Sequence, residues 1–442
     1  MPSAPLPSAP LRDAARAAEA GAAERAIARW LLLVAAMVWI MVALGGATRL
    51  TGSGLSIMEW APLSGTLPPL SEAEWNRLYE LYKTIPQYEL VNRGFGLEGF
   101  KQIFWLEWVH RFWGRLIGLA YLLPLLWFWW RGRIPAGLGP RLLLLLALGG
   151  MQGVVGWIMV ASGFEPDRTT VSPYRLVVHL GFALALYGAL LWTALSLLRP
   201  SAPATAAAGS ALRRWVWATA GLAALTMLAG GFVAGIRAGL DYNTFPLMDG
   251  RLVPQGYWWL EPAWRNLTEN VAAVQFNHRL LATLTLLAAV GTAYVALRGG
   301  GARGGGGTGD AALLRRAALG LLGAVVLQFG LGVATLLLVV PVWLGTLHQA
   351  AAVLVLTMAL VVLHALRPAR PPGRTVGPPA WPGRAGWRRR TASLIRGAAR
   401  ATFPPRLSHQ DTPLKCPIPS TSSSSAPAPA AMFAPSAPRS SA

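Results

Sequence analysis

WLLLVAAMVWIMVALGGAT, residues 30–48, is an uninterrupted apolar run of the length that crosses a lipid bilayer as one helix. Seven similar runs follow it, at 112–130, 142–161, 176–198, 215–236, 278–297, 317–340 and 342–366. Backbone groups have no water to bind inside lipid, so we expect each run to form a helix. The chain is 54% hydrophobic and only 13% charged, which excludes an ordinary water-soluble protein. The sequence therefore predicts an all-α integral membrane protein with eight transmembrane helices.

The placement of the positive charge predicts the orientation of the chain. An even number of spans puts both termini and the loops at 131–141, 199–214 and 298–316 on one side. That side carries 26 Lys and Arg but 5 Asp and Glu, so it holds the whole net charge of +21. By the positive-inside rule both termini are then cytoplasmic in a cell inner membrane, or face the matrix in a mitochondrion. No nucleic-acid partner is needed to explain the charge.

The two ends of the chain differ in composition from the apolar part. Residues 1–29 lack the order of a signal peptide and are predicted to be a cytoplasmic tail. Residues 367–442 are rich in Arg, Pro and Ser, which predicts disorder. The single cysteine, Cys416, lies in this second tail and excludes a disulfide within one chain.

The chain repeats itself after four spans. The loop GLSIMEWAPLSGTLPP (54–69) resembles GLDYNTFPLMDGRLVP (239–254), and WVHR (108–111) resembles FNHR (276–279). Further matching positions are Gly45-Gly46 with Gly230-Gly231, Gln152 with Gln328, and His179 with His348. Parallel repeats are a known membrane architecture. We therefore predict two pseudo-symmetric four-helix bundles, 30–198 and 215–366, joined by a linker at 199–214.

Four of the six histidines lie at repeat-equivalent positions, one in each even-numbered span. A lone histidine in such a helix most often hydrogen-bonds to a neighbouring helix. Four of them at one predicted depth, within the first turns of their helices, instead make two facing pairs. An iron porphyrin takes axial imidazoles from both faces, so the pairs favour two bis-histidine haem sites. The four are His110, His179, His278 and His348; His364 and His409 have no counterparts and are not assigned as ligands.

The two halves differ at the residue that lies one helical turn before the first histidine. Glu107 precedes His110 on the same helix face, whereas Gln275 holds the matching position before His278. A carboxylate beside a haem edge can relay a proton, but an amide can only hydrogen-bond. This difference favours substrate oxidation in the first half and a resident haem in the second. The alternative is that Glu107 is an interfacial acid that caps the start of its helix.

Several arginines lie at the level of the histidines. Arg49, Arg111 and Arg279 are candidate partners for haem propionates, because a guanidinium matches a carboxylate in geometry and charge. The alternative for each is anchoring at the membrane interface. Arg115 lies one turn inside its predicted span, where we expect it to turn outward or to pair with a haem or a neighbouring helix.

Seven segments, taken in order, resemble the haem A synthase family in its proteobacterial and mitochondrial branch. Any one of them would be weak evidence, and together they are highly specific. The resemblance covers about residues 30–366. The segments are GGATRLTGSGLSIMEWAPLSGTLPP (45–69), FKQIFWLEWVHRFWGRLIG (100–118), MQGVVGWIMVASG (151–163), VSPYRLVVHL (171–180), AGLDYNTFPLMDG (238–250), VQFNHR (274–279) and LQFGLGVATLLLVVPVWLGTLHQ (327–349).

The resemblance implies an oxidoreductase that converts a methyl group of haem O to the formyl group of haem A, the haem of terminal oxidases, by two successive hydroxylations. It implies haem B on His278 and His348, haem O near His110 and His179, and a catalytic role for Glu107. The implied partners are a haem O synthase, a ferredoxin-type electron donor and membrane lipid, and the family pattern allows a homo-oligomer. Two other interpretations remain at this point: a bis-histidine di-haem cytochrome b that only transfers electrons, and a duplicated transporter without haem.

Overall fold

The computed structural model describes residues 9–62, 64–199, 210–299 and 308–367. Regular structure in these residues is helical, apart from an isolated bridge between Met248 and Arg251. Eight of the described helices are long and apolar enough to cross a membrane, which confirms the predicted fold class. They are α1 (Ala9–Leu50), α4 (Gly96–Trp130), α5 (Gly139–Ala161), α6 (Pro173–Leu198), α7 (Ser210–Gly235), α8 (Val271–Gly299), α9 (Thr308–Leu337) and α10 (Val342–Ala365).

Two of these helices begin well before the apolar runs that predicted them. Helix α1 begins at Ala9, because residues 9–29 are rich in alanine, the strongest helix former. Helix α4 begins at Gly96 rather than at 112. Its first part mixes charged and aromatic residues, which lowers the hydropathy without breaking the helix. The prediction that His110 lies within the first turns of its helix was therefore wrong, since residues 96–109 of α4 precede it.

Short helices fill the connection between α1 and α4. They are η1 (Ser64–Thr66), α2 (Glu72–Tyr82) and α3 (Pro86–Leu90). Ser71 caps α2 by accepting a 3.2 Å hydrogen bond from the backbone N–H of Glu74. Tyr82 and Ile85 pack on Phe100 and Phe104 at the start of α4, in a small apolar core separate from the cores among the long helices.

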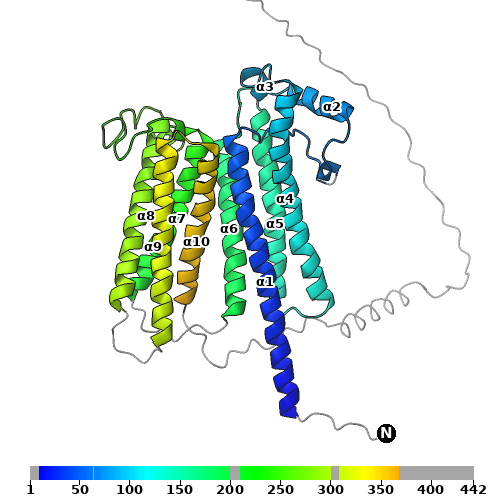
Figure 1. Cartoon of the computed structure of the whole chain (residues 1–442), viewed down its shortest axis with the longest axis vertical. Helices are drawn as coiled ribbons and strands as arrows, with labels where there is room; N and C mark the ends of the chain where they lie inside the picture. Colours follow the sequence, from blue (N-terminus) through cyan, green and yellow to red (C-terminus); the bar gives the residue numbers. More distant parts are fainter. Residues whose placement is uncertain (1–8, 63, 200–209, 300–307, 368–442) are drawn as a thin grey trace, which may run out of the picture. The chain divides into compact units, whose positions relative to one another are not determined.

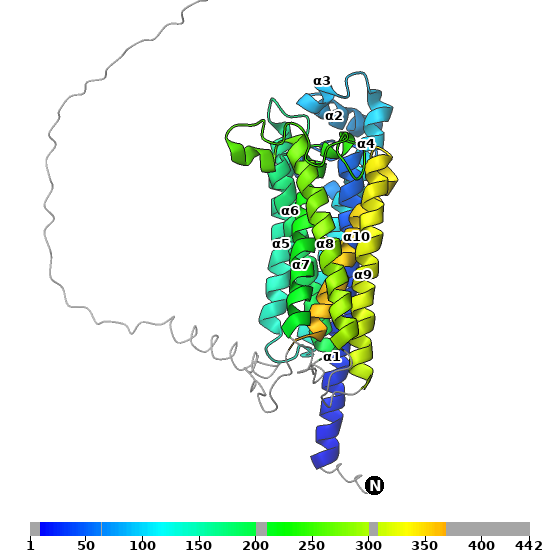
Figure 2. The same ribbon diagram turned by 90° about the vertical axis from the view of Figure 1, so that its left-hand side faces the viewer.

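The connections α1–α4 and α7–α8 lie at the same end of the long helices, here called the loop end (Figures 1 and 2). The α7–α8 connection contains η3 (Ala238–Leu240) and η4 (Ala263–Leu267), and η2 (Ser162–Phe164) follows α5. The two connections that the repeat predicts to be equivalent are thus brought to one end, above the long helices that carry the histidines.

Helices α1, α4, α5 and α6 pack against one another, and so do α7, α8, α9 and α10. The two groups meet where α1 contacts α10 and α6 contacts α7 and α10. At this seam the hydroxyl groups of Tyr187 and Thr357 are 2.6 Å apart. These contacts are compatible with two four-helix bundles. Residues 368–442 of the predicted tail (367–442), which include His409 and Cys416, lie outside the described residues, as do most of the linker (200–209) and residues 300–307.

Candidate active site

One cavity of about 1370 Å³ brings the predicted site residues together. Its wall is formed by residues of all eight long helices and is mostly apolar. The cavity has room for large, flat and mainly apolar ligands. The predicted site residues that line it are Glu107, the four histidines His110, His179, His278 and His348, and the three arginines Arg49, Arg111 and Arg279.

Each of the four imidazole rings packs against a glycine on the long helix that precedes its own. A Cβ atom added to that glycine would lie about 3 Å from the Cε1 atom of the ring, closer than ordinary packing allows. Glycine is therefore needed for the imidazole to keep its place. The four pairs, with the distance from the added Cβ to Cε1, are Gly45–His110 (3.2 Å), Gly156–His179 (2.9 Å), Gly230–His278 (3.0 Å) and Gly332–His348 (2.9 Å).

The polar surroundings of the rings also repeat. The Nε2 atom of Gln152 lies 3.4 Å from Nε2 of His179, and that of Gln328 lies 3.4 Å from Nε2 of His348. In the described part of the chain, the buried Nδ1 atoms of His110, His179 and His348 have no hydrogen-bond partner. Nδ1 of the fourth ring, His278, lies 3.1 Å from a backbone carbonyl oxygen in α7. Buried imidazoles that the protein leaves largely unpaired are suited to bind a ligand in the cavity.

The arrangement fits an iron porphyrin better than a bare metal ion. Among the described residues, no group of three or more His, Cys, Asp or Glu side chains could hold a metal ion. His110 and His179 of the first half, and His278 and His348 of the second, line the same cavity. Two imidazoles complete the coordination of an iron whose other four ligands come from a porphyrin. The four glycines that pack against the imidazole rings, here called the glycine cradles, and the apolar walls leave space for the flat porphyrin.

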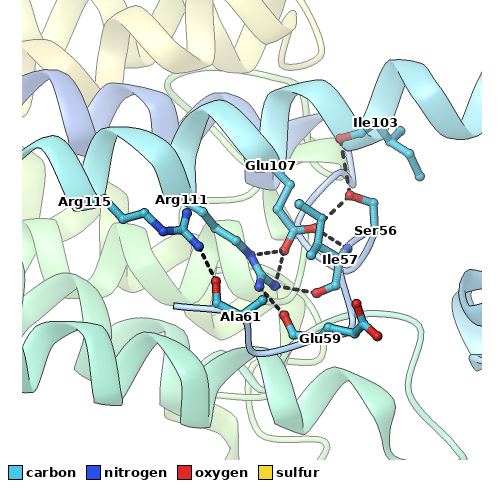
Figure 3. A network of polar contacts seen from close by, with 8 residues as sticks. All are labelled: Ser56, Ile57, Glu59, Ala61, Ile103, Glu107, Arg111 and Arg115. Atoms are coloured by element: carbon cyan, nitrogen blue, oxygen red, sulfur yellow. Dashed lines mark hydrogen bonds and ion pairs between the residues drawn. The ribbon is translucent and has the colours of Figure 1, made fainter. Parts of the chain in front are cut away.

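Glu107 is buried at the cavity wall, with a side chain that is only 3% exposed (Figure 3). Its Oε2 atom accepts hydrogen bonds from the Ser56 hydroxyl (2.8 Å) and the backbone N–H of Ile57 (2.9 Å). Its Oε1 atom accepts hydrogen bonds from Nε (3.0 Å) and Nη2 (2.6 Å) of Arg111. Because Glu107 lies about three turns inside α4, the interpretation of it as a helix-capping acid is wrong.

Arg111 also holds the loop that follows α1. Besides its ion pair with Glu107, its guanidinium donates to the carbonyl oxygens of Ile57 and Glu59, the latter at 2.9 Å (Figure 3). A buried carboxylate with four donors around it is fixed in position and orientation. Sequence reasoning missed Ser56 and this loop, since only the fold brings residues 56–59 onto α4.

The second half repeats this geometry without the negative charge. Arg279 donates to the carbonyl oxygens of Tyr242 (2.6 Å) and Thr244 (2.9 Å), the residues that match Ile57 and Glu59 in the repeat. Its Nη2 also donates to Oε1 of Gln275 at 2.7 Å. Arg279 is thus paired with a neutral amide where Arg111 is paired with a carboxylate.

Arg49 lies at the junction of the halves. It donates to the last carbonyl oxygens of α7, those of Ala234 (3.1 Å) and Gly235 (2.8 Å). These carbonyls have no partner within their helix, and a cation there also interacts favourably with the helix dipole. The structure therefore gives Arg49 a protein partner, in addition to its place on the cavity wall.

Arg115 does not turn away from the protein. It donates to the carbonyl oxygens of Ala61 (2.7 Å) and Pro62 (2.9 Å) in the same loop, and it lines the cavity. Its charge is therefore paired with a loop rather than with a neighbouring helix. His364 is buried near Ser196 at the other end of the helices and is not among the residues that line the cavity.

The sequence of the chain matches the model of a family described as cytochrome oxidase assembly protein (COX15-CtaA) over residues 28–360. The chain belongs to this family. The match covers all eight long helices except the beginning of α1 and the last residues of α10. With its eight apolar helices, this member of the cytochrome oxidase assembly family is a multi-pass membrane protein.

Similar proteins from several proteobacteria carry the name Heme A synthase. One from Granulibacter bethesdensis is 60% identical over 349 residues, which cover 79% of this chain and 88% of that protein. One from Rhodospirillum centenum is 50% identical over 351 residues (79% and 91%). One from Nitrosospira multiformis is 47% identical over 349 residues (78% and 94%). None of these comparisons supports the alternatives of an electron-transferring cytochrome b or a transporter.

Proposed function

We propose that this protein is a haem A synthase, an oxidoreductase that converts a methyl group of haem O to the formyl group of haem A. Relatives of that name, up to 60% identical over most of the chain, support the activity. The structural observation that carries it is the difference between the halves. A buried carboxylate, Glu107, lies one turn from His110, and an amide, Gln275, holds the same place beside His278.

In this proposal the first half binds the substrate. His110 and His179 flank haem O, and the carboxylate of Glu107 lies at the same cavity wall. Each of the two hydroxylations is a monooxygenation: with dioxygen as the oxidant and two electrons from the external donor, one C–H bond of the methyl group becomes C–OH, one water is released and two protons are consumed. Glu107 is the candidate relay for these protons, and the diol that results loses water to give the aldehyde. Arg111 holds the Glu107 carboxylate through its ion pair and also donates to the loop carbonyl oxygens of Ile57 and Glu59. Ser56 and Ile57 keep the carboxyl group in place during the proton relay.

The second half holds the resident cofactor, haem B, between His278 and His348. Bound there, haem B would supply a redox-active iron for electron transfer. Gln275 cannot take up a proton at neutral pH, so the environment of this site stays constant. Among the described residues, the side chain to which Arg279 donates a hydrogen bond is this neutral amide, so its guanidinium is a candidate partner for a propionate of the resident haem. Arg49 lies on the same cavity wall and is a further candidate.

The proposed orientation in the membrane follows from the distribution of positive charge, and the proposed partners follow from the family resemblance. The bundles comprise residues 30–198 and 215–366, in a cell inner membrane with both termini in the cytoplasm, because the positive charge gathers on that side. A haem O synthase supplies the substrate and a ferredoxin-type protein supplies electrons. The same fold allows a homo-oligomer.

Haem extraction tests the activity directly. The gene is expressed in a strain that makes haem O but lacks its own haem A synthase, and the extracted haems are separated by chromatography. We expect haem A to appear only when the gene is present. If haem O persists and the membrane contains a red low-spin haem protein, the proposed enzyme activity is refuted. The interpretation as an electron-transferring cytochrome b is then favoured.

A further inference from the structure

The seam between α4 and α5 differs from the equivalent seam between α8 and α9. Helices α8 and α9 share a continuous apolar core that includes Ala289, Leu321 and Val325. Helices α4 and α5 contact each other much less. The buried residues of their shared core stop at Tyr121 on α4 and Leu145 on α5, far from the loops. Residues of both helices join one apolar core again only at the loop end, where Phe104 is buried and Met159 packs against the same cluster.

The repeat explains this difference in terms of side-chain volume. At three positions along the seam the first half has glycine, and the second half has a large apolar side chain that is buried or partly buried. Leu286 packs against the core of the second half, Val325 is buried in it, and the ring of Phe329 contacts that of Phe245. The matching pairs are Gly118 with Leu286, Gly149 with Val325 and Gly153 with Phe329.

The large cavity opens through this seam. A Cβ atom added to Gly118, Gly149, Gly150 or Gly153 would meet no atom within 4 Å. All four glycines line the cavity, and all four are exposed. Leu119 and Trp157 also line it, although their side chains are 50% and 47% exposed. A residue that both lines a cavity and is exposed lies at its opening. These six residues are here called the α4–α5 mouth.

Two contacts frame the mouth along the helix axis. Far from the loops, the Tyr121 hydroxyl donates a 2.8 Å hydrogen bond to the carbonyl oxygen of Leu142. Towards the loop end, the ring of Trp60 lies 5.8 Å from that of Trp157. Leu142 and Trp157 are separated along α5 by about 22 Å, at 1.5 Å per residue. This opening is taller than a porphyrin ring, and the residues around it are exposed on the outer surface of the helices.

We propose that the α4–α5 mouth is the lateral passage through which haem O enters the first half from the lipid and haem A leaves it. The proposal rests on the proposed function. Substrate and product carry the same long isoprenoid chain, which partitions into lipid, and a glycine-lined gap admits both the flat ring and the chain. The second half has the corresponding gap filled by Leu286, Val325 and Phe329, so its haem cannot exchange with lipid by that route.

Replacing glycines of the α4–α5 mouth by the residues that the second half has at the matching positions tests the proposal. The double variant Gly118→Leu, Gly149→Val is compared with wild type and with the control Gly323→Val, which adds a side chain at an open α9 position outside the cavity. Each purified holoprotein is placed in proteoliposomes containing haem O and reductant. We expect the double variant to lose most haem A formation while haem B per chain stays at the wild-type level. Equal haem A formation in all three proteins would overturn the passage.

A labelling experiment tests the passage independently if the double variant Gly118→Leu, Gly149→Val folds poorly. Gly150→Cys in a Cys416→Ser background places one thiol in the mouth, and Gly323→Cys serves as the matched control. Haem O in the vesicles should slow modification of Cys at position 150 by a membrane-permeant maleimide, and should leave position 323 unaffected. Equal rates with and without haem O would contradict the passage. A wild type that forms no haem A would instead refute the proposed function, so the two failures are distinguishable.

Discussion

Glu107 and Arg111 form a buried ion pair one turn apart on α4, with 2.6 Å between Oε1 and Nη2. The same turn of α8 carries Gln275 and Arg279, joined by a neutral hydrogen bond of 2.7 Å. Both arginines also hold the equivalent loop carbonyls of their half. At this turn the two halves therefore keep one geometry, and the first half has a carboxyl group where the second has an amide, which is the physical basis for proposing proton transfer in the first half.

Replacing Glu107 by Gln should abolish most haem A formation without harming the fold. The second half already contains a Gln–Arg pair in this geometry, so the amide should keep the loop in place. Loss of a general acid–base group lowers rates by about 10²–10⁴-fold. Haem extraction from membranes measures haem A, and the purified protein should retain wild-type haem B. An unchanged yield of haem A would remove Glu107 from the mechanism.

The glycine cradles predict that one methyl group, added by a Gly→Ala substitution, displaces the histidine ring that packs against the glycine. Gly230→Ala and Gly332→Ala should lower the haem B content, because the new Cβ would lie 3.0 and 2.9 Å from Cε1 of His278 and His348. Gly323→Ala is the control, since its Cβ meets no atom within 4 Å. The visible spectrum of the purified protein measures bound low-spin haem. Normal haem content in both cradle variants would show that the rings are not held by these glycines.

Arg49→Ala separates a structural role from a propionate-binding role. Loss of the hydrogen bonds to Ala234 and Gly235 should lower the free energy of unfolding by on the order of 1–3 kcal/mol, as expected for charge-assisted hydrogen bonds. Thermal unfolding in detergent, at matched haem B content, measures this change. Arg49→Lys is the control, because it keeps the charge but not the forked geometry. An unchanged unfolding temperature with reduced haem content would instead favour propionate binding.

Much of the fold was predictable because membrane helices have a strong local signal. Apolar runs located all eight helices, and the repeat matched His110 with His278 and His179 with His348 before any geometry was known. The beginning of α4 was not predictable from hydropathy, because residues such as Glu98 and Lys101 make it polar while Phe100 and Phe104 are buried against α2 and α3. Tertiary contacts, rather than the average polarity, keep that segment helical.

The candidate site was predictable in its residues but not in its contacts. Residue spacing placed Glu107 near His110, yet the donors from Ser56 and Ile57 come from a loop about 50 residues earlier in the chain. Arg49 was predicted beside a haem, and its contacts with the end of α7 required knowledge of how α1 and α7 meet. The opening between α4 and α5 depends on the absence of side chains, which becomes visible only when the two halves are compared in three dimensions.

The division of labour between the halves is tested most directly by measuring which haems remain bound after each histidine pair is removed. The double variants His110→Ala, His179→Ala and His278→Ala, His348→Ala are purified from a strain that makes haem B and haem O, and the haems are extracted and quantified per chain. We expect the first variant to keep haem B and to lose haem O and haem A, and the second to lose haem B. Equal loss of haem B in both variants would contradict a resident site in the second half and a substrate site in the first.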